Sequence, residues 1–293
     1  MQKFGFLAQR LFNTPIAIKP EKAEVIMAAL AERLGISRMA RMDGVELNLK
    51  PMAFDDGDFD REANNPRKGY DIVGGVAVIE VCGTLVQKNG TLRPYSGMTG
   101  YDGIRQNFLT ALADPSVQAI VLDIDSPGGE VAGCFDLVDT IYSARGRKPI
   151  WSILSECAYS AAYAIASAAD RICVPRTGGV GSIGVIWMHV DWSKAISEAG
   201  MEVTFITYGE HKADGNSYQK LPDDVKARFQ ADIDRMGELF VNTVARNLGL
   251  DADKIRSTQA LTFLGEEGVS QGLAHAVQSP DAAFMALLEM LAE

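Results

Sequence analysis

The fold is decided by one stretch of the sequence, Ala119-Ile-Val-Leu-Asp-Ile-Asp-Ser-Pro-Gly-Gly-Glu130. Its first six residues form a short apolar run rich in β-branched side chains, which predicts a buried strand. The Pro-Gly-Gly that follows predicts a turn, with a helix after it. A strand that leads through a turn into a helix is the repeating unit of a parallel α/β sheet, so this stretch favours the α/β class.

The same pattern recurs before and after this stretch. Further short apolar runs predict strands at 76–81, 150–154, 171–174 and 203–207. Helices are predicted between the strands, at 101–113, 134–144, 160–169 and 193–199. Apolar residues at helical spacing also predict a long helix over 223–248 and shorter helices over 21–35 and 281–291. The alternation of strands and helices predicts an α/β core.

The chain has the composition of an ordinary globular protein, with 47% hydrophobic and 23% charged residues among 293. Residues 52–70 are polar and acidic, which indicates a linker. We therefore divide the chain into an N-terminal helical extension with an acidic linker (1–69), a core domain (70–280) and a C-terminal helix (281–293).

The bulk chemistry excludes several classes of function. A net charge of −10 argues against a nucleic-acid partner, because phosphate binding needs an excess of Lys and Arg. Four cysteines without a CxxC pair predict free thiols in a reducing compartment and no metal site. No apolar run approaches the roughly 20 residues of a membrane span, and Gln9 and Arg10 interrupt the N-terminal one. We expect a cytoplasmic protein with no membrane span and no cofactor.

One serine stands where a strand meets a helix of small residues. Ser160 follows the strand predicted at 150–154 and begins Ser-Ala-Ala-Tyr-Ala-Ile-Ala. A hydroxyl at this place often only caps the helix, and that explanation suffices for the residue alone. The same place also aims the hydroxyl above the sheet, as in a nucleophile elbow, and lets the Ala161 amide join an oxyanion hole. The amides of Gly128 or Gly129 are candidates for its other half, although a plain turn accounts for those glycines equally well.

A glycine-rich run invites a nucleotide-binding interpretation. Gly179-Val-Gly-Ser-Ile-Gly184 matches GxGxxG, but the residues after it, 185–190, predict a strand rather than a helix. The Gly-Lys-Ser/Thr ending of a phosphate loop is also absent. We exclude a nucleotide site here.

A serine nucleophile needs a base within hydrogen-bonding reach, and two candidates are neighbours in the sequence. Lys212 is the first; a lysine serves only if burial or apolar neighbours lower its pKa, and a single lysine is ordinarily a solvated loop charge. His211 is the second, with Asp123, Asp125 or Asp214 to orient it in a Ser-His-Asp triad.

Four motifs in order resemble the signal peptide peptidase A family, and especially its phage members that act as capsid-assembly (prohead) proteases. They are DSPGG at 125–129, AYSAAY at 158–163, GSIGV at 181–185 and HKADGN at 211–216. The ordered series is far more specific than any one motif, and the resemblance covers about residues 70–280.

The resemblance implies a serine endopeptidase in which Ser160 is the nucleophile and Lys212 the general base. It implies an oxyanion hole from the amides of Gly128 or Gly129 together with Ala161. In such Ser/Lys dyads a second hydroxyl often holds the lysine ammonium in place, and we expect Ser182 to do so. Residues 70–280 would then be the peptidase domain.

The family also implies a fold and partners. The fold is a Clp protease/crotonase-like spiral of ββα units, here with the helical N-terminal extension. Relatives form rings, so we expect a homo-oligomer in which serine and lysine come from one chain or from adjacent subunits. The expected substrates are phage head proteins (scaffold, portal or capsid) during prohead maturation. The alternatives are a signal-peptide-peptidase-like protease of membrane or cytosolic peptides, a non-catalytic crotonase-like assembly module and an acyl-CoA-processing crotonase enzyme.

Overall fold

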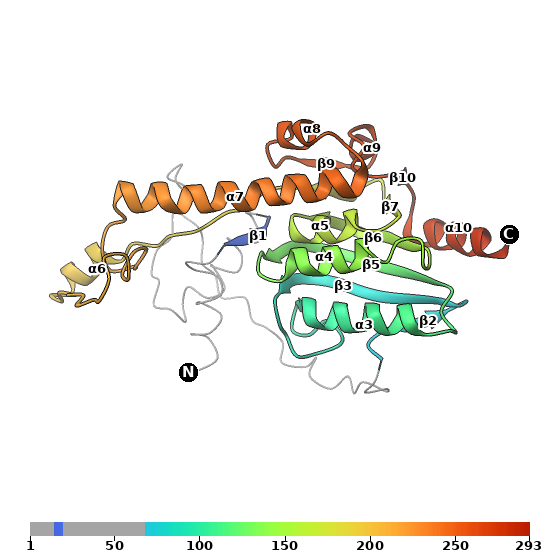
Figure 1. The fold of residues 1–293 in the computed structure, drawn as a ribbon, viewed down its shortest axis with the longest axis horizontal. Coiled ribbons are helices and arrows are strands. Elements are labelled where there is room, and N and C mark those ends of the chain that lie inside the picture. The colour runs from blue at the N-terminus through green and yellow to red at the C-terminus, as the bar shows by residue number, and fades with distance from the viewer. Residues whose placement is uncertain (1–14, 20–67) are drawn as a thin grey trace.

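A mixed β-sheet forms the centre of the molecule in the computed structural model, which describes residues 15–19 and 68–293 (Figure 1). The strands of the described residues are β1 (Ile16–Ile18), β2 (Asp71–Val73), β3 (Val76–Val86), β4 (Met98–Gly100), β5 (Ala119–Glu130), β6 (Ile150–Tyr159), β7 (Arg171–Val174), β8 (Gly179–Gly181), β9 (Thr262–Leu264) and β10 (Ala276–Val277). The helices are α3 (Tyr101–Ala113), α4 (Cys134–Tyr142), α5 (Ala161–Ser167), α6 (Ser193–Glu198), α7 (Asp223–Leu248), α8 (Ala252–Ser257), α9 (Gly265–Ser270) and α10 (Pro280–Ala292).

The main strands run parallel, with helices in between. The order across the sheet is β10-β7-β6-β5-β3-β2, and all these neighbours pair in parallel except β2, which is antiparallel to β3. The α/β class is therefore confirmed.

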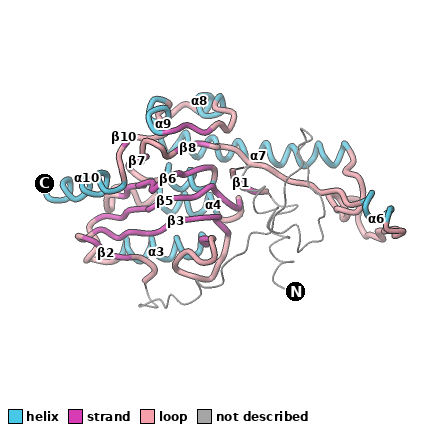
Figure 2. Tube along the Cα trace, turned by 180° about the vertical axis from the view of Figure 1, so that it is seen from behind, coloured by secondary structure: helices cyan, strands magenta, loops and turns pink. Residues whose placement is uncertain are grey.

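Both faces of the sheet are buried because successive side chains of a strand point to opposite sides. On β5, Ile120, Leu122 and Ile124 join the core cluster that holds α3, α4 and α5, whereas Ala119 and Val121 join a second cluster with α10. Figure 2 shows the strands in front of α3 and α4. This arrangement fixes the carboxyl ends of β5 and β6, where the candidate site lies.

A projecting arm leaves the core on one side. We define the arm as residues 187–236, which comprise α6, the chain around it and the first half of α7. The last turns of α7 are buried through Phe240 and Val244, but its first turns and α6 extend away from the sheet (Figure 1). The arm is held together by its own contacts, among them Trp187 against Phe229 at a centroid distance of 4.5 Å.

Most predicted elements are present, and three local predictions are wrong. Strands begin at all four positions predicted in the core, and the helices at 101–113 and 223–248 have the predicted bounds. Residues 203–207 are not a strand, because no strand of residues 15–19 or 68–293 pairs with this exposed part of the arm. Residues 185–190 form only one isolated bridge, at Ile186. The helix predicted at 21–35 and most of the linker lie outside the described residues.

The predicted Pro-Gly-Gly turn is the third correction. β5 continues through Pro127, Gly128 and Gly129 to Glu130, and α4 begins only at Cys134. The strand is irregular rather than turned: its pairing with β6 shifts register between Ile124 and Ser126. Paired strands on its flanks keep this glycine segment extended, which a local turn propensity does not take into account.

Candidate active site

Ser160 lies at the junction of β6 and α5 in a backbone conformation that is unusual for serine. Its φ is 54° and its ψ is −122°, and strain of this kind persists only where the surrounding structure enforces it. The hydroxyl makes no hydrogen bond to the amides of α5; instead Oγ donates to the carbonyl of Gly184 over 3.3 Å. Helix capping therefore does not account for Ser160, and the strained strand-to-helix turn is that of a nucleophile elbow.

Two sets of backbone amides border this serine. The Ala161 amide opens α5 and has no acceptor among residues 15–19 and 68–293, as expected for the first turn of a helix. Gly128 lies opposite: a Cβ built on it would lie 3.0 Å from Cβ of Ser160. Its φ of 102° also favours glycine. The structure thus brings together Ser160, Ala161 and the Gly128–Gly129 segment, as the sequence predicts.

The Gly128 amide already has a partner. It donates to the Ser126 hydroxyl over 3.1 Å, and that hydroxyl donates to the Gly83 carbonyl over 2.6 Å. Gly129 faces another element, since it is paired with Ala17 of β1. Ser126 lies inside the DSPGG motif at 125–129, but no sequence pattern indicates that its hydroxyl holds the Gly128 amide.

The strand β1 runs alongside this segment, and nothing in the sequence predicted it. Ile16–Ile18 pairs antiparallel with residues 128–130 of β5. A run of three residues between two prolines is too short to show a strand period, and it falls inside the extension expected to be helical.

Ser182 borders the site through the backbone. The Ser160 amide donates to the carbonyl of Gly181 over 2.9 Å, and Ser182 follows directly with a φ of 54°. Ser182 is 8% exposed, and its amide donates to Leu261 over 2.9 Å. Its expected role as a positioning hydroxyl remains a prediction.

Lys212 lies in the arm and not beside Ser160. It is exposed, its amide closes a turn onto the Gly209 carbonyl at 3.2 Å, and its ammonium pairs with no described residue. The exposed side chains Phe205, Ile206 and Tyr208 precede it in the chain. Within one chain the structure therefore does not bring the predicted base to the predicted nucleophile.

The alternative base, His211, also lies away from Ser160. His211 Nδ1 lies 3.1 Å from Asp214 Oδ2, so a His-Asp pair exists, but it sits in the arm, where Arg228 also binds Asp214 over 2.5 Å. Asp123 and Asp125 lie on β5, where they accept hydrogen bonds from β6 side chains. In the described part of the chain Ser160 hydrogen-bonds to none of the three histidines, so no Ser-His-Asp triad forms within it.

The nearby thiols are not competing nucleophiles. Burial, reinforced by the Asp125 carboxylate, raises the pKa of Cys157 to about 12. Burial, reinforced by Asp123, raises the pKa of Cys82 to about 11. Both thiols are therefore protonated at neutral pH and weakly reactive. In residues 15–19 and 68–293 no three His, Cys, Asp or Glu side chains are grouped to hold a metal ion.

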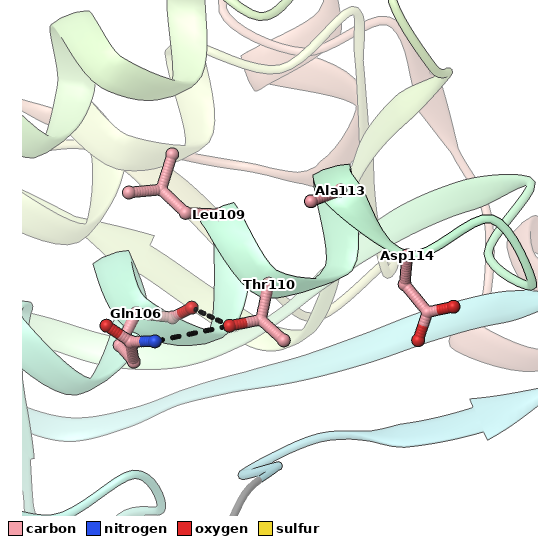
Figure 3. Close-up of a pocket in the computed structure, with 5 residues that line it drawn as sticks. All are labelled: Gln106, Leu109, Thr110, Ala113 and Asp114. Carbon is pink, nitrogen blue, oxygen red and sulfur yellow. Dashed lines mark hydrogen bonds between the residues drawn. The ribbon is translucent and has the colours of Figure 1, made fainter.

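A shallow hollow on α3 does not belong to this site. It is lined by Gln106, Leu109, Thr110, Ala113 and Asp114 (Figure 3). Gln106 and Thr110 bond to each other within the helix, and no residue of the candidate site lines the hollow.

A family of known proteins matches the segment of the chain that contains Ser160. The profile described as Peptidase family S49 matches residues 143–292, which include Ser160, Ser182 and Lys212. The chain belongs to peptidase family S49. The match begins before β6 and ends with α10, so this family segment carries the strand-to-helix turn, β8 and the arm.

Two phage proteins are similar to this chain over nearly all of its length. The chain is 40% identical over 289 residues to capsid assembly protease C of Escherichia phage lambda, covering 96% of this chain and 65% of that protein. It is 39% identical over 264 residues to head-tail preconnector protein GP5 of Enterobacteria phage P21, covering 90% of this chain and 53% of that protein. The chain thus spans less than two thirds of the length of either relative.

More distant similarities were found as well. Protease 4 of Haemophilus influenzae is 25% identical over 72% of this chain and 34% of its own length. Among solved structures, ClpP1 of Listeria monocytogenes aligns with a TM-score of 0.41 and 14% identity, over 69% of this chain and 90% of that one. An enoyl-CoA hydratase/isomerase family member aligns with a TM-score of 0.43 and 17% identity, over 76% and 74%. No helix of the described residues is long and apolar enough to cross a membrane.

Proposed function

We propose that this protein is a serine endopeptidase that uses Ser160 as nucleophile and Lys212 as general base, and that it processes phage head proteins during prohead maturation. The observation that carries the proposal is the Ser160 turn: a strained serine whose hydroxyl leaves its own helix uncapped and whose Cβ lies beside Gly128. Membership of the S49 peptidases supports the same reaction.

The reaction follows from these groups. Ser160 Oγ attacks the scissile carbonyl carbon while the neutral Lys212 amine takes the hydroxyl proton. The Ala161 amide and an amide of Gly128 or Gly129 donate to the developing oxyanion. Lys212 then gives its proton to the departing amine, and water attacks the acyl-enzyme with the same lysine as base. Ser182 accepts a hydrogen bond from the lysine in this scheme.

The general base is proposed to come from a neighbouring copy of the chain. Lys212 is exposed in the arm of its own chain, whereas a lysine that acts as a general base needs apolar surroundings. The apolar side chains Ile206 and Tyr208, which are 97% and 102% exposed, would be covered when the arm docks on another subunit. Desolvation by such neighbours lowers the pKa of a lysine, which then becomes a usable base.

The substrate class follows from the relatives rather than from the site. The names capsid assembly protease and head-tail preconnector protein place both relatives in phage head assembly. We therefore propose proteins of the phage head as substrates, acted on inside the host cell or the prohead.

A mixing experiment tests the nucleophile, the base and their origin together. Ser160→Ala and Lys212→Ala chains are each expected to be inactive on a head-protein substrate. When they are co-expressed, a ring with heterologous contacts places a native serine beside a native lysine in about a quarter of its sites, so about a quarter of wild-type activity returns. The readout is the rate of substrate trimming per subunit.

Labelling with a fluorophosphonate identifies the nucleophile independently. Mass spectrometry is expected to find the adduct on Ser160 in the wild type and no adduct in Ser160→Ala. Adduct formation that persists in Ser160→Ala contradicts the assignment, and a mixture that stays inactive while each single variant assembles contradicts the shared site. A chain that assembles but neither labels nor trims is the non-catalytic module.

A further inference from the structure

The short strand β1 lies between two other segments and bonds to both. On one side it pairs antiparallel with β5, and the Lys19 amide donates to the Pro127 carbonyl over 2.9 Å. On the other side Ile16 and Ile186 exchange two backbone hydrogen bonds, each of 3.0 Å. A single extended segment held by its backbone on both sides is how a groove takes an added strand.

This strand crosses the site at the nucleophile. A Cβ built on Gly128 would lie 2.2 Å from the Ala17 carbonyl oxygen and 3.0 Å from Cβ of Ser160. The Ala17 oxygen and the Ser160 side chain therefore approach Gly128 at the same place. Alternation of the antiparallel ladder, counted from the Lys19 to Pro127 bond, directs the backbone of Ala17 toward Gly129. The carbonyl of Ala17 therefore stands beside the serine and the glycine amides, where a scissile carbonyl has to stand.

The strand also fills the space around the serine. Ile16, Ala17 and Ile18 are 4%, 2% and 5% exposed, and Ser160 is 1% exposed. The Lys19 ammonium lies over the Tyr159 ring, 4.9 Å from its centroid, directly before Ser160 in the chain. A second peptide cannot use the same backbone groups of β5 and residue 186 while β1 holds them.

We propose that β5 and residues 184–186 form a groove for an extended peptide with an alanine-sized residue opposite Ser160, and that residues 15–19 of the same chain occupy this groove as an inhibitory strand. The segment has to leave before a substrate enters. The inference rests on the proposed function for the role of Ser160, but the strand occupancy is a property of the groove alone.

Peptide binding in a variant without the nucleophile tests the occupancy. The probe is a fluorescein-labelled peptide with the sequence of residues 14–20, Thr-Pro-Ile-Ala-Ile-Lys-Pro, added to full-length Ser160→Ala protein. Ile16→Pro in that background removes the amide that donates to Ile186, whereas Ile16→Val keeps it. Fluorescence anisotropy is expected to show at least about tenfold tighter binding to the proline variant, because its groove is open for a larger fraction of the time.

A second pair of variants covers the case in which Ile16→Pro does not fold. Lys19→Pro removes both the hydrogen bond to Pro127 and the cation above Tyr159, whereas Lys19→Arg keeps the amide and a cation above Tyr159. Circular dichroism melting curves identify the variants that are folded. A folded proline variant is expected to bind the labelled peptide more tightly than its conservative control does.

Equal affinity in the folded proline variants and their controls overturns the proposal. It is also overturned if the intact mass of the wild-type protein shows a chain beginning at Ile18, because the segment would then be a substrate and not a resident strand. Peptide binding needs no general base, so a protein that fails the labelling and trimming tests can still satisfy this one. Conversely, a protein that is labelled and trims its substrate, but whose proline variants gain no affinity for the peptide, supports the proposed function and overturns the inhibitory strand.

Discussion

The surroundings of Ser160 and of Lys212 differ in almost every physical respect. Ser160 is 1% exposed, strained, and bordered by β5, β8 and α5. Lys212 is exposed in a turn of the arm that carries no β-ladder. The first region is held by the pairing of β6 with β5 and β8, whereas the second depends on a few side-chain contacts to α7.

This contrast shows which part of the proposed site depends on assembly. The proposed nucleophile and the proposed oxyanion donors all lie in the sheet core of one chain. The base stands on an element whose position depends on what the arm contacts. Activity would then report assembly, since an unassembled chain has a nucleophile without its base.

Removal of either reactive group is expected to give the largest effect and to separate the two regions. Ser160→Ala and Lys212→Ala each lower kcat/KM by at least about 10³-fold, because the two groups act as a unit. Only the arm variant leaves the thermal midpoint unchanged, since its side chain is exposed. Peptide hydrolysis and calorimetry provide the readouts.

Matched controls exist in the same regions. Ser155→Ala removes an exposed serine of β6, and Lys220→Ala removes a second exposed lysine of the arm. Both are expected to keep near-native activity. An equal loss of activity in Lys220→Ala indicates that the charge of the arm, and not one base, is what matters.

Gly128→Ala is expected to be the next most damaging change. The new Cβ meets the Ala17 oxygen and the Ser160 Cβ, and the φ of 102° is strained for alanine. Displacement of the glycine amides lowers kcat by about 10²-fold. The comparison is Gly146→Ala, whose φ is 80° but whose Cβ would meet nothing within 4 Å.

Both glycine variants are expected to lose about 1–3 kcal/mol of unfolding free energy through backbone strain. Only the Gly128 variant is expected to lose activity as well. Chemical denaturation and hydrolysis rates measured on the same samples decide this; an equal loss of activity in both variants shows that strain, and not the site, is responsible.

Arg228→Ala probes the arm with a smaller effect. Arg228 binds Asp214 and Asp224 and contacts His211, the neighbour of Lys212. Without it the turn that carries the lysine is less well held, so kcat falls by about fivefold at most while the thermal midpoint stays unchanged. Arg235→Ala is the control, because Asp232 on α7 itself is the one ion-pair partner of Arg235 among the described residues.

The smallest expected effect is that of pH on the thermal midpoint, through His275. Desolvation, with smaller contributions from Arg171 and Arg145, lowers the pKa of His275, whose Nδ1 accepts a hydrogen bond from the Ile172 amide over 3.0 Å. The unfolded chain therefore takes up this proton at a higher pH than the folded one. The stabilisation is complete above about pH 6.5 and is lost as the pH falls through the lowered folded value.

The measurement is the thermal midpoint at pH 7 and at pH 5. The wild type is expected to lose about 1–2 °C more than His275→Asn, in which an amide oxygen accepts the same hydrogen bond at both pH values. His211→Asn, in the arm, is expected to behave as the wild type. A smaller pH effect on the His211 variant than on the His275 variant contradicts this assignment.

The parts of the fold that the sequence predicted are those set by local pattern. The strands at 119–124 and 150–154 and the helices at 101–113 and 223–248 show their period within a few residues. Ser160 was placed at its turn for the same reason, since a strand, a serine and a helix of small residues follow one another directly.

The rest depends on partners that lie far away in the sequence. Residues 203–207 have the β-branched composition of a strand, but no strand in the described part of the chain pairs with them. Residues 16–18 have no strand pattern of their own, yet they are a strand because β5 and Ile186 bond to them. The hydrogen bond from Ser160 to Gly184 and the position of Lys212 in the arm are likewise consequences of tertiary structure.

The helix α7 connects the two regions, because its last turns pack on the core and its first turns belong to the arm. Its 26 residues span about 39 Å, and its last turns are fixed by packing such as Phe240 against Phe135 at a centroid distance of 5.6 Å. A tilt of about 5° about this fixed end moves the other end by about 3 Å, which is the length of a hydrogen bond. A small rearrangement of aromatic side chains in the core would thus displace the far end of the helix by a larger distance, although these side chains lie near its fixed end.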